Sequence, residues 1–210
     1  MTVPTSDAPT RRFVDTNGVR LQVTEAGPPG APVVLLAHGF PQLGFSWRHQ
    51  VAALAEAGYR VLAPDLRGYG GSSKPERIEA YTTVESAADL VGLLDAAGAD
   101  RAAIVGHDFG ATLAWTASLL HPDRFAGVAG LSVPPVPRPR VPTTDAFRRI
   151  FGDNFFYILY FQQVGPPDAE LDRDPATTLR KLFGSPALDD PAAAARMAAP
   201  GPQGFLDRLP

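Results

Sequence analysis

The 210-residue sequence contains no cysteine, only four histidines and no long apolar run. Without cysteine the chain can form neither a disulfide nor a thiolate nucleophile, which fits a cytoplasmic enzyme. No stretch approaches the ~18 apolar residues that a membrane-spanning helix needs. The net charge of -3 lacks the basic excess typical of nucleic-acid binding. The first ten residues are polar and show no apolar signal sequence. We therefore expect a cytoplasmic protein with neither a membrane nor a nucleic-acid partner.

Apolar runs alternate with helical periodicity over the first 133 residues. Asn17-Gly18 is a strong hairpin-turn signal near the amino terminus. Thr82 and Glu85 have the spacing of a capping box and predict the start of a helix. Strands that alternate with helices indicate an α/β fold, with a mostly parallel sheet and helices on both faces. The expected buried strands are residues 32–38, 59–64, 102–106 and 125–133.

The composition changes after Val133. Residues 134–142, PPVPRPRVP, are rich in proline and predict an extended linker. An aromatic segment follows at 154–163, and then come short alanine-rich helical pieces broken by proline. We expect an α/β core over residues 1–133. Residues 134–210 are expected to hold the linker and part of a helical cap over the sheet.

Three glycine-containing loops follow three of the predicted strands: HGFP (38–41), DLRGYGGSS (65–73) and GHDFG (106–110). Open α/β sheets bind ligands at the carboxyl ends of their strands, so we expect these loops to meet at one edge. In GHDFG, glycines stand two residues before and two residues after Asp108. This spacing predicts a strained strand-to-helix turn that exposes the Asp108 side chain. An ordinary tight turn with a solvated or capping aspartate is the simpler alternative.

An aspartate at such a turn favours a particular chemistry. Its ordinary pKa is near ~3.9, so it is already a carboxylate at neutral pH. A carboxylate suits in-line displacement at a saturated carbon with a strained or good leaving group, as in an epoxide or an alkyl halide. The product is an ester of the enzyme's own carboxyl group. Hydrolysis of that ester passes through an oxyanion that backbone N–H groups can stabilise.

Four segments, HGFPQLGFSWRHQ, DLRGYGGSSKP, VGHDFGA and YILYFQ, occur in the order typical of one family. They resemble the α/β-hydrolase fold family and, more narrowly, its epoxide hydrolase branch. The resemblance runs from about residue 13 to the last residue. It implies an enzyme that opens small apolar epoxides to diols through an ester on Asp108, with no cofactor and no metal.

The resemblance also implies roles for individual residues. The backbone N–H groups of Phe40 and Phe109 would form the oxyanion hole, and a cis peptide bond would precede Pro41. The hydroxyl of Tyr157 would donate to the epoxide oxygen, with Tyr160 as its positional rival. Without the resemblance, both tyrosines are simply core aromatics of a cap helix. The residues expected to contact substrate are Pro41, Trp47 and Tyr160.

In this fold the catalytic triad runs nucleophile, acid, histidine, and no histidine follows His121. We therefore expect the amino-terminal part of an epoxide hydrolase. It would lack the final strands, the triad acid and the triad histidine, and would be inactive alone. His38 is expected to be structural, His49 exposed, His107 turned from the catalytic face and His121 a helix cap.

Two alternatives remain open. A haloalkane dehalogenase would use the same aspartate, although the ring of Phe109 has no N–H to hold a halide as a tryptophan does. A non-catalytic binding module with an α/β-hydrolase-like fold would need no nucleophile at all.

Overall fold

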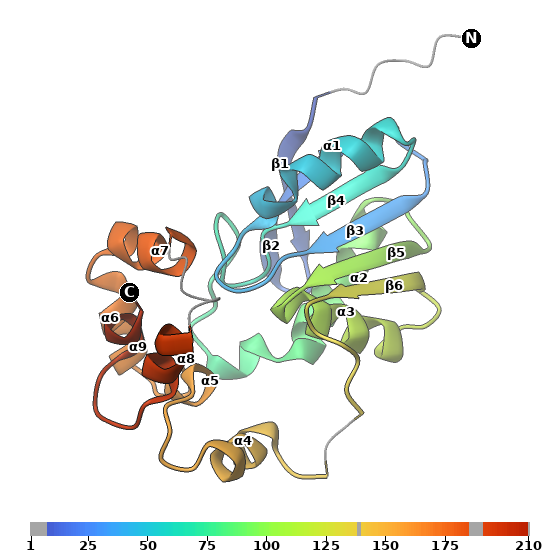
Figure 1. The fold of residues 1–210 in the computed structure, drawn as a ribbon. Helices are drawn as coiled ribbons and strands as arrows, with labels where there is room; N and C mark the ends of the chain where they lie inside the picture. The colour runs from blue at the N-terminus through green and yellow to red at the C-terminus, as the bar shows by residue number, and fades with distance from the viewer. Residues whose placement is uncertain (1–7, 138–139, 185–190, 210) are drawn as a thin grey trace. The chain divides into compact units, whose positions relative to one another are not determined.

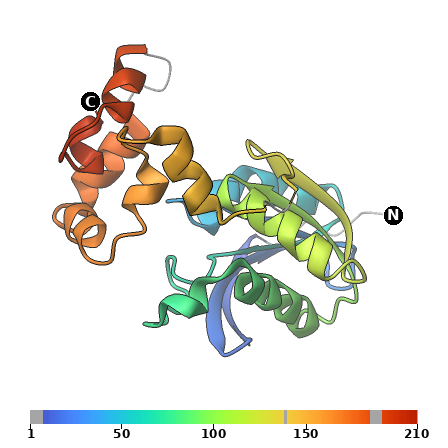
Figure 2. The same cartoon turned by 90° about the horizontal axis from the view of Figure 1, so that it is seen from below.

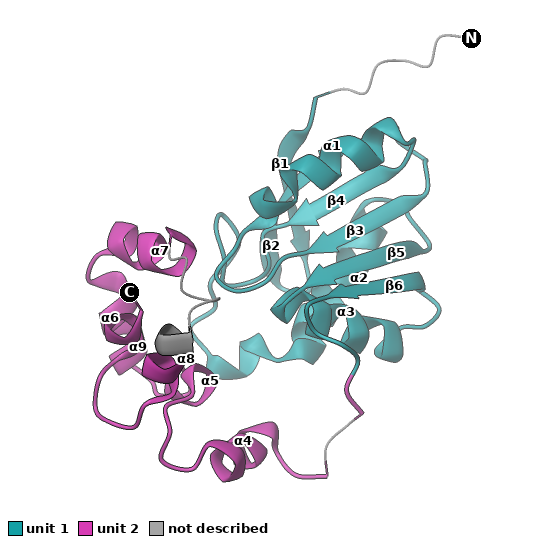
Figure 3. Cartoon of the chain, in the orientation of Figure 1, with its two compact units in different colours: residues 1–135 teal, residues 136–210 magenta. Residues whose placement is uncertain are grey.

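The computed structural model describes residues 8–137, 140–184 and 191–209. The chain divides into two compact units, residues 1–135 and residues 136–210 (Figure 3). The boundary predicted from the sequence lies after Val133, two residues before this division.

In the described part of the first unit, six strands form one mixed sheet in the order β1-β2-β4-β3-β5-β6 (Figure 1). The pairs β3–β4, β3–β5 and β5–β6 are parallel, whereas β1–β2 and β2–β4 are antiparallel. The four strands predicted from apolar runs thus form the parallel part, which confirms the α/β fold class. The prediction that residues 125–133 are buried is wrong, because β6 lies at the edge of the sheet and is exposed after Phe125. The strands are β1 (Thr10–Thr16), β2 (Val19–Ala26), β3 (Val33–Ala37), β4 (Arg60–Pro64), β5 (Ala102–His107) and β6 (Phe125–Leu131).

Helices cover both faces of this sheet (Figures 1 and 2). On one face, α1 (Arg48–Glu56) and the preceding 3-10 turn η1 (Gly44–Trp47) pack against Val34 and Leu36. On the other face, α2 (Thr83–Ala96) and α3 (Phe109–Leu120) pack against Leu35. Successive side chains of a strand point to opposite faces, so β3, fully buried, contributes to both cores.

Local signals in the sequence place the turns correctly. Asn17 and Gly18 both have positive φ, 44° and 72°, in the turn between β1 and β2. The side chain of Thr82 accepts a hydrogen bond from the Glu85 backbone N–H at the start of α2. Gly58, with φ of 89°, follows the end of α1. The turn predicted at Asn17-Gly18 and the helix start predicted at Thr82 are confirmed, because each depends only on residues that are neighbours in sequence.

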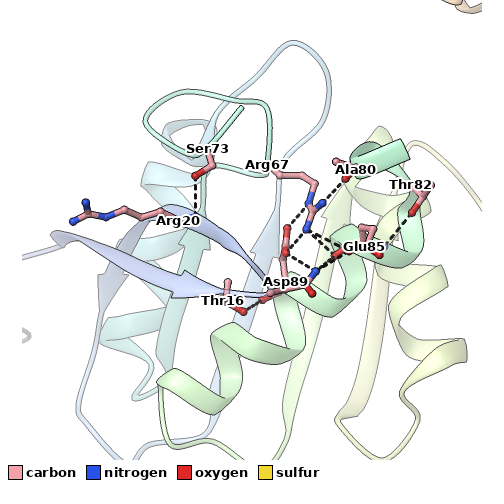
Figure 4. A network of polar contacts seen from close by, with 9 residues as sticks. Thr16, Arg20, Arg67, Ser73, Ala80, Thr82, Glu85 and Asp89 are labelled. Carbon is pink, nitrogen blue, oxygen red and sulfur yellow. Dashed lines mark hydrogen bonds and ion pairs between the residues drawn. The ribbon is translucent and has the colours of Figure 1, made fainter. Parts of the chain in front are cut away.

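A buried ion pair fixes the loop that follows β4 (Figure 4). Arg67 and Asp89 lie 2.5 Å apart, and their side chains are only 4% and 3% exposed. Arg67 also donates to the backbone oxygens of Ala80 and Glu85, and Asn17 donates to Asp89. Hydrogen bonds to Asp89 raise the pKa of Arg67, so it remains a cation. The network ties residues 65–73 to α2, to η2 (Ile78–Tyr81) and to the β1–β2 turn.

The second unit is helical in its described part, and aromatic side chains pack its interior. Tyr157 contacts the rings of Phe156, Phe161 and Phe205. No helix among the described residues of either unit is long and apolar enough to cross a membrane. The helices are α4 (Thr143–Phe151), α5 (Tyr157–Tyr160), α6 (Pro166–Asp172), α7 (Pro175–Gly184), α8 (Pro191–Ala198) and α9 (Phe205–Arg208).

Candidate active site

The three glycine-containing loops leave the sheet at one edge. Strands β3, β4 and β5 run in the same direction, so the loops after them, at residues 38, 65 and 108, start side by side (Figure 1). Contacts link all three loops, since the His38 ring bonds to the Leu66 backbone and Phe40 bonds to Asp108. The predicted meeting of the loops is confirmed.

Asp108 lies at the apex of the turn between β5 and α3. Its φ of 55° and ψ of -122° lie outside the regions that L-residues favour. A Cβ on Gly106 would collide with the carbonyl of Gly110, and a Cβ on Gly110 would collide with the carbonyl of Ala37. The two glycines therefore allow the strand and helix to approach closely. The Asp108 side chain makes no capping hydrogen bond to α3, so the ordinary capping turn is not what forms here.

The backbone N–H of Phe40 donates to Oδ1 of Asp108 at 3.0 Å. Gly39 makes this contact possible, because a Cβ there would lie 2.5 Å from the Cβ of Asp108. The cis peptide bond expected between Phe40 and Pro41 is present. Phe109, expected to be the second donor, is the first residue of α3. Its N–H belongs to the first turn, whose N–H groups have no acceptor within the helix.

His38 lies beneath this loop and is completely buried. Its Nε2 accepts from the backbone N–H of Leu66 at 3.0 Å, and its Nδ1 lies 3.0 Å from the carbonyl oxygen of Gly39. A backbone N–H can only donate, so Nε2 is the acceptor and Nδ1 carries the proton. Burial lowers the pKa of His38, which favours the neutral ring.

Tyr69 lies at this site although no role was predicted for it from the sequence. Its ring packs edge-on against the His38 ring, with centroids 4.9 Å apart. Burial, and next the negative charge of Asp108, raise the pKa of Tyr69 to about 12. The phenol therefore stays protonated close to the carboxylate. Its position within DLRGYGGSS was the one available signal, since that loop was expected at the active edge.

The other three histidines lie on β5, on α1 and at the end of α3. Nδ1 of His107 is 3.2 Å from the side-chain oxygen of Gln42, in the loop after β3. His49 is exposed on α1, and His121 is the C-cap residue of α3, both as expected. Within the described ranges, no histidine ring bonds to the Asp108 carboxylate.

Trp47, predicted to contact substrate, is placed in the core instead. It is 7% exposed and packs with Val51 and Val61 between α1 and the sheet. Its indole Nε1 has no hydrogen-bond partner within the described part of the chain. An aromatic residue near a glycine-rich loop looks the same in sequence whether it faces the ligand or the core. Trp47 therefore has no place in the function proposed below.

The two tyrosines of α5 differ in their environment. The hydroxyl of Tyr160 donates to Glu170 at 2.7 Å, and Glu170 is 8% exposed. Burial, followed by this bond, raises the pKa of Tyr160 to about 12. Glu170 also accepts from the backbone N–H groups of Phe205 and Leu206, so Tyr160 belongs to a polar network that holds the start of α9. Tyr157 packs instead among aromatic rings.

The α/β fold and the loops that meet at the carboxyl ends of β3, β4 and β5 are features that a known family shares. Residues 32–160 match the family described as alpha/beta hydrolase fold. That match covers more than half of the chain and includes β3, β5 and the turn at Asp108. The chain belongs to the α/β hydrolase fold family.

Particular relatives narrow the comparison. The chain is 66% identical over 204 residues to epoxide hydrolase A of Mycobacterium tuberculosis, covering 97% of this chain and 63% of the relative. It is 46% identical over 166 residues to an epoxide hydrolase of Caballeronia sordidicola, covering 79% of this chain and 49% of the relative. The crystal structure of epoxide hydrolase A from Mycobacterium thermoresistibile superposes with a TM-score of 0.93 at 62% identity, covering 96% of this chain and 63% of the other. The chain thus spans less than two-thirds of the length of these epoxide hydrolases.

Proposed function

We propose that this chain supplies the nucleophile and the oxyanion donors of an epoxide hydrolase that acts on small apolar epoxides. The observation that carries the proposal is the carboxylate of Asp108, raised on a strained turn with one oxygen held by the Phe40 N–H. The similarity to proteins named epoxide hydrolases supports the choice of substrate class.

The first step is displacement at an epoxide carbon. Oδ1 of Asp108 is held by Phe40, so Oδ2 is the oxygen that attacks. A carbon–oxygen bond forms to Oδ2 while a ring carbon–oxygen bond breaks, and the departing oxygen takes a proton from a tyrosine hydroxyl. The resemblance of YILYFQ to the epoxide hydrolases assigns that role to Tyr157. Tyr160 is less suited to this role because its hydroxyl already donates to Glu170. The product is a hydroxyalkyl ester on Asp108.

The second step is hydrolysis of that ester. Water attacks the carboxyl carbon of Asp108 and gives a proton to a base, and the departing alkoxide later takes up a proton. Negative charge develops on Oδ1, where the Phe40 N–H already lies. Phe109 would supply the second donor. Collapse of this intermediate releases the diol and restores the carboxylate. All four histidines lie in the described ranges and none bonds to Asp108, so we assign no water-activating histidine among the described residues. We therefore expect the 210-residue chain to complete alkylation but not repeated turnover.

The proposal is tested by intact-mass spectrometry of the purified chain after incubation with styrene oxide. We expect one added substrate mass, which peptide mapping assigns to Asp108. Asp108→Asn should abolish the adduct, whereas the matched control Asp123→Asn, at an exposed aspartate, should retain it. Absence of any adduct, or an adduct that survives Asp108→Asn, would contradict the proposal. Faster adduct formation with 1-chlorobutane than with the epoxide would favour halide displacement instead.

A further inference from the structure

The peptide group between Gly39 and Phe40 is held at both ends. Its N–H donates to Oδ1 of Asp108 at 3.0 Å. Its carbonyl oxygen lies 3.0 Å from Nδ1 of His38 and accepts from the backbone N–H of Gln42 at 2.8 Å. The C=O and N–H of a trans peptide lie in one plane and point in opposite directions. Whatever fixes the carbonyl therefore also aims the N–H.

The His38 ring is itself locked in one tautomer and orientation. Leu66 donates to Nε2, which leaves the proton on Nδ1 to be donated to Gly39. The edge of the Tyr69 ring packs against the imidazole, and the side chain of His38 is fully buried. The ring thus presents a fixed donor to the far side of the peptide that faces the nucleophile.

We propose that His38 is a positioning residue that aims and polarises the Phe40 N–H for the ester-hydrolysis step. This inference rests on the function proposed above. A hydrogen bond accepted by a peptide carbonyl makes the N–H of the same peptide a better donor, because linked hydrogen bonds polarise one another. His38 touches neither Asp108 nor substrate, and it acts only through the Gly39–Phe40 peptide.

The two chemical steps should respond differently to His38. Alkylation removes negative charge from the Asp108 carboxylate, so a stronger Phe40 donor does not speed that step. Ester hydrolysis places a full negative charge on Oδ1, so a stronger, well-aimed donor stabilises its transition state. A general packing role for His38 would instead weaken folding and affect both steps alike.

Two substitutions separate the functions of the two ring nitrogens. In His38→Asn the amide nitrogen stands as far along the side chain as Nδ1 and can still donate to Gly39. In His38→Gln the amide oxygen stands as far along as Nε2 and can still accept from Leu66. His49→Asn and His49→Gln, at an exposed position, are the matched controls.

The experiment alkylates each purified variant with styrene oxide, removes the excess and follows loss of the Asp108 ester by intact mass. Because we assign no base among the described residues, the ester is lost only slowly, by attack of solvent hydroxide, and that attack still places negative charge on Oδ1. Only folded molecules become alkylated, so the decay rate reports on folded protein even where a variant is less stable. We expect His38→Gln to slow ester loss about tenfold, less than the ~10²–10³-fold cost of removing a donor outright. His38→Asn should restore most of the rate, with alkylation rates similar in both variants. Stability towards urea should not rank the variants as the rate of ester loss does. His38→Gln, the slower variant, keeps the acceptor of the buried Leu66 N–H, which His38→Asn loses.

Equal ester loss in the two variants, or a rate order that follows stability, would overturn the inference. The amide proton resonance of Phe40 gives a second measurement that needs no adduct. It should move upfield in His38→Gln and stay near its wild-type position in His38→Asn. If the wild-type chain forms no adduct, the proposed function fails, while this resonance still decides the role of His38.

Discussion

Gly39→Ala should slow alkylation of Asp108 by about 100-fold while leaving the chain folded, on the scale of a ~1 Å misplacement of reacting groups. A Cβ at this position would lie 2.5 Å from the Cβ of Asp108 and 2.8 Å from its Oδ1. Carbon atoms in contact prefer separations of ~3.5–4.0 Å, so the nucleophile or the loop must move by about 1 Å. Gly39 has no positive φ, so alanine adds no backbone strain there.

A shift of this size breaks the contact that orients the carboxylate. The 3.0 Å bond from Phe40 to Oδ1 would lengthen beyond the ~3.2 Å limit of an ordinary N–H···O hydrogen bond. Oδ2 would then no longer be the only oxygen free to attack. Overpacking in a tight site costs about 1–3 kcal/mol of folding free energy, so we expect a modest loss of stability rather than unfolding.

The measurement is the second-order rate constant for adduct formation with styrene oxide, together with a urea titration of each protein. Gly127→Ala is the matched control, because a Cβ at Gly127 meets no atom within 4 Å and its φ is not positive. The control should alkylate at the wild-type rate. A Gly39→Ala variant that reacts as fast as the control would refute the close contact between the loop and the nucleophile.

Four further predictions concern Asp89, the two tyrosines of α5 and His38. Asp89→Ala leaves the buried cation of Arg67 without its carboxylate and should lower the free energy of unfolding by about 3–5 kcal/mol in urea titrations; a loss below about 1 kcal/mol, the scale of an exposed pair, would contradict the buried network. Tyr157→Phe should slow alkylation by about 100-fold, the scale of a lost general acid. An unchanged alkylation rate in Tyr157→Phe would show that Tyr157 is not the proton donor. Tyr160→Phe should instead cost about 1–3 kcal/mol of stability, because buried Glu170 loses a hydrogen-bond donor. Burial lowers the pKa of His38, so the stability contributed by its neutral ring should be present above about pH 6.5 and be lost as the pH falls below that value. His38→Gln should flatten that part of the curve between pH 8 and 5, and an unaltered slope would show that His38 is not the group responsible.

The sequence by itself determined the local features of this protein. The glycines around Asp108 already required a strained turn, because only residues without a Cβ allow β5 and α3 to approach so closely. The apolar runs identified the parallel strands, and Asn17-Gly18 and Thr82 identified a turn and a helix start. Each of these features depends on neighbouring residues or on a periodicity that a single segment displays.

Only the tertiary structure decided which residues contact Asp108 and which do not. Phe40 and Asp108 are 68 positions apart, and their bond exists because β3 and β5 are adjacent in the sheet. The pairing of β3 with β4 brings the Leu66 N–H to the His38 ring, and the loop after β4 places Tyr69 near the carboxylate. Packing of α1 against the sheet buries Trp47. A sequence pattern indicates that a side chain is apolar or that it lies near a loop. The order of the strands and the alternation of side chains between the two faces determine which residues it contacts.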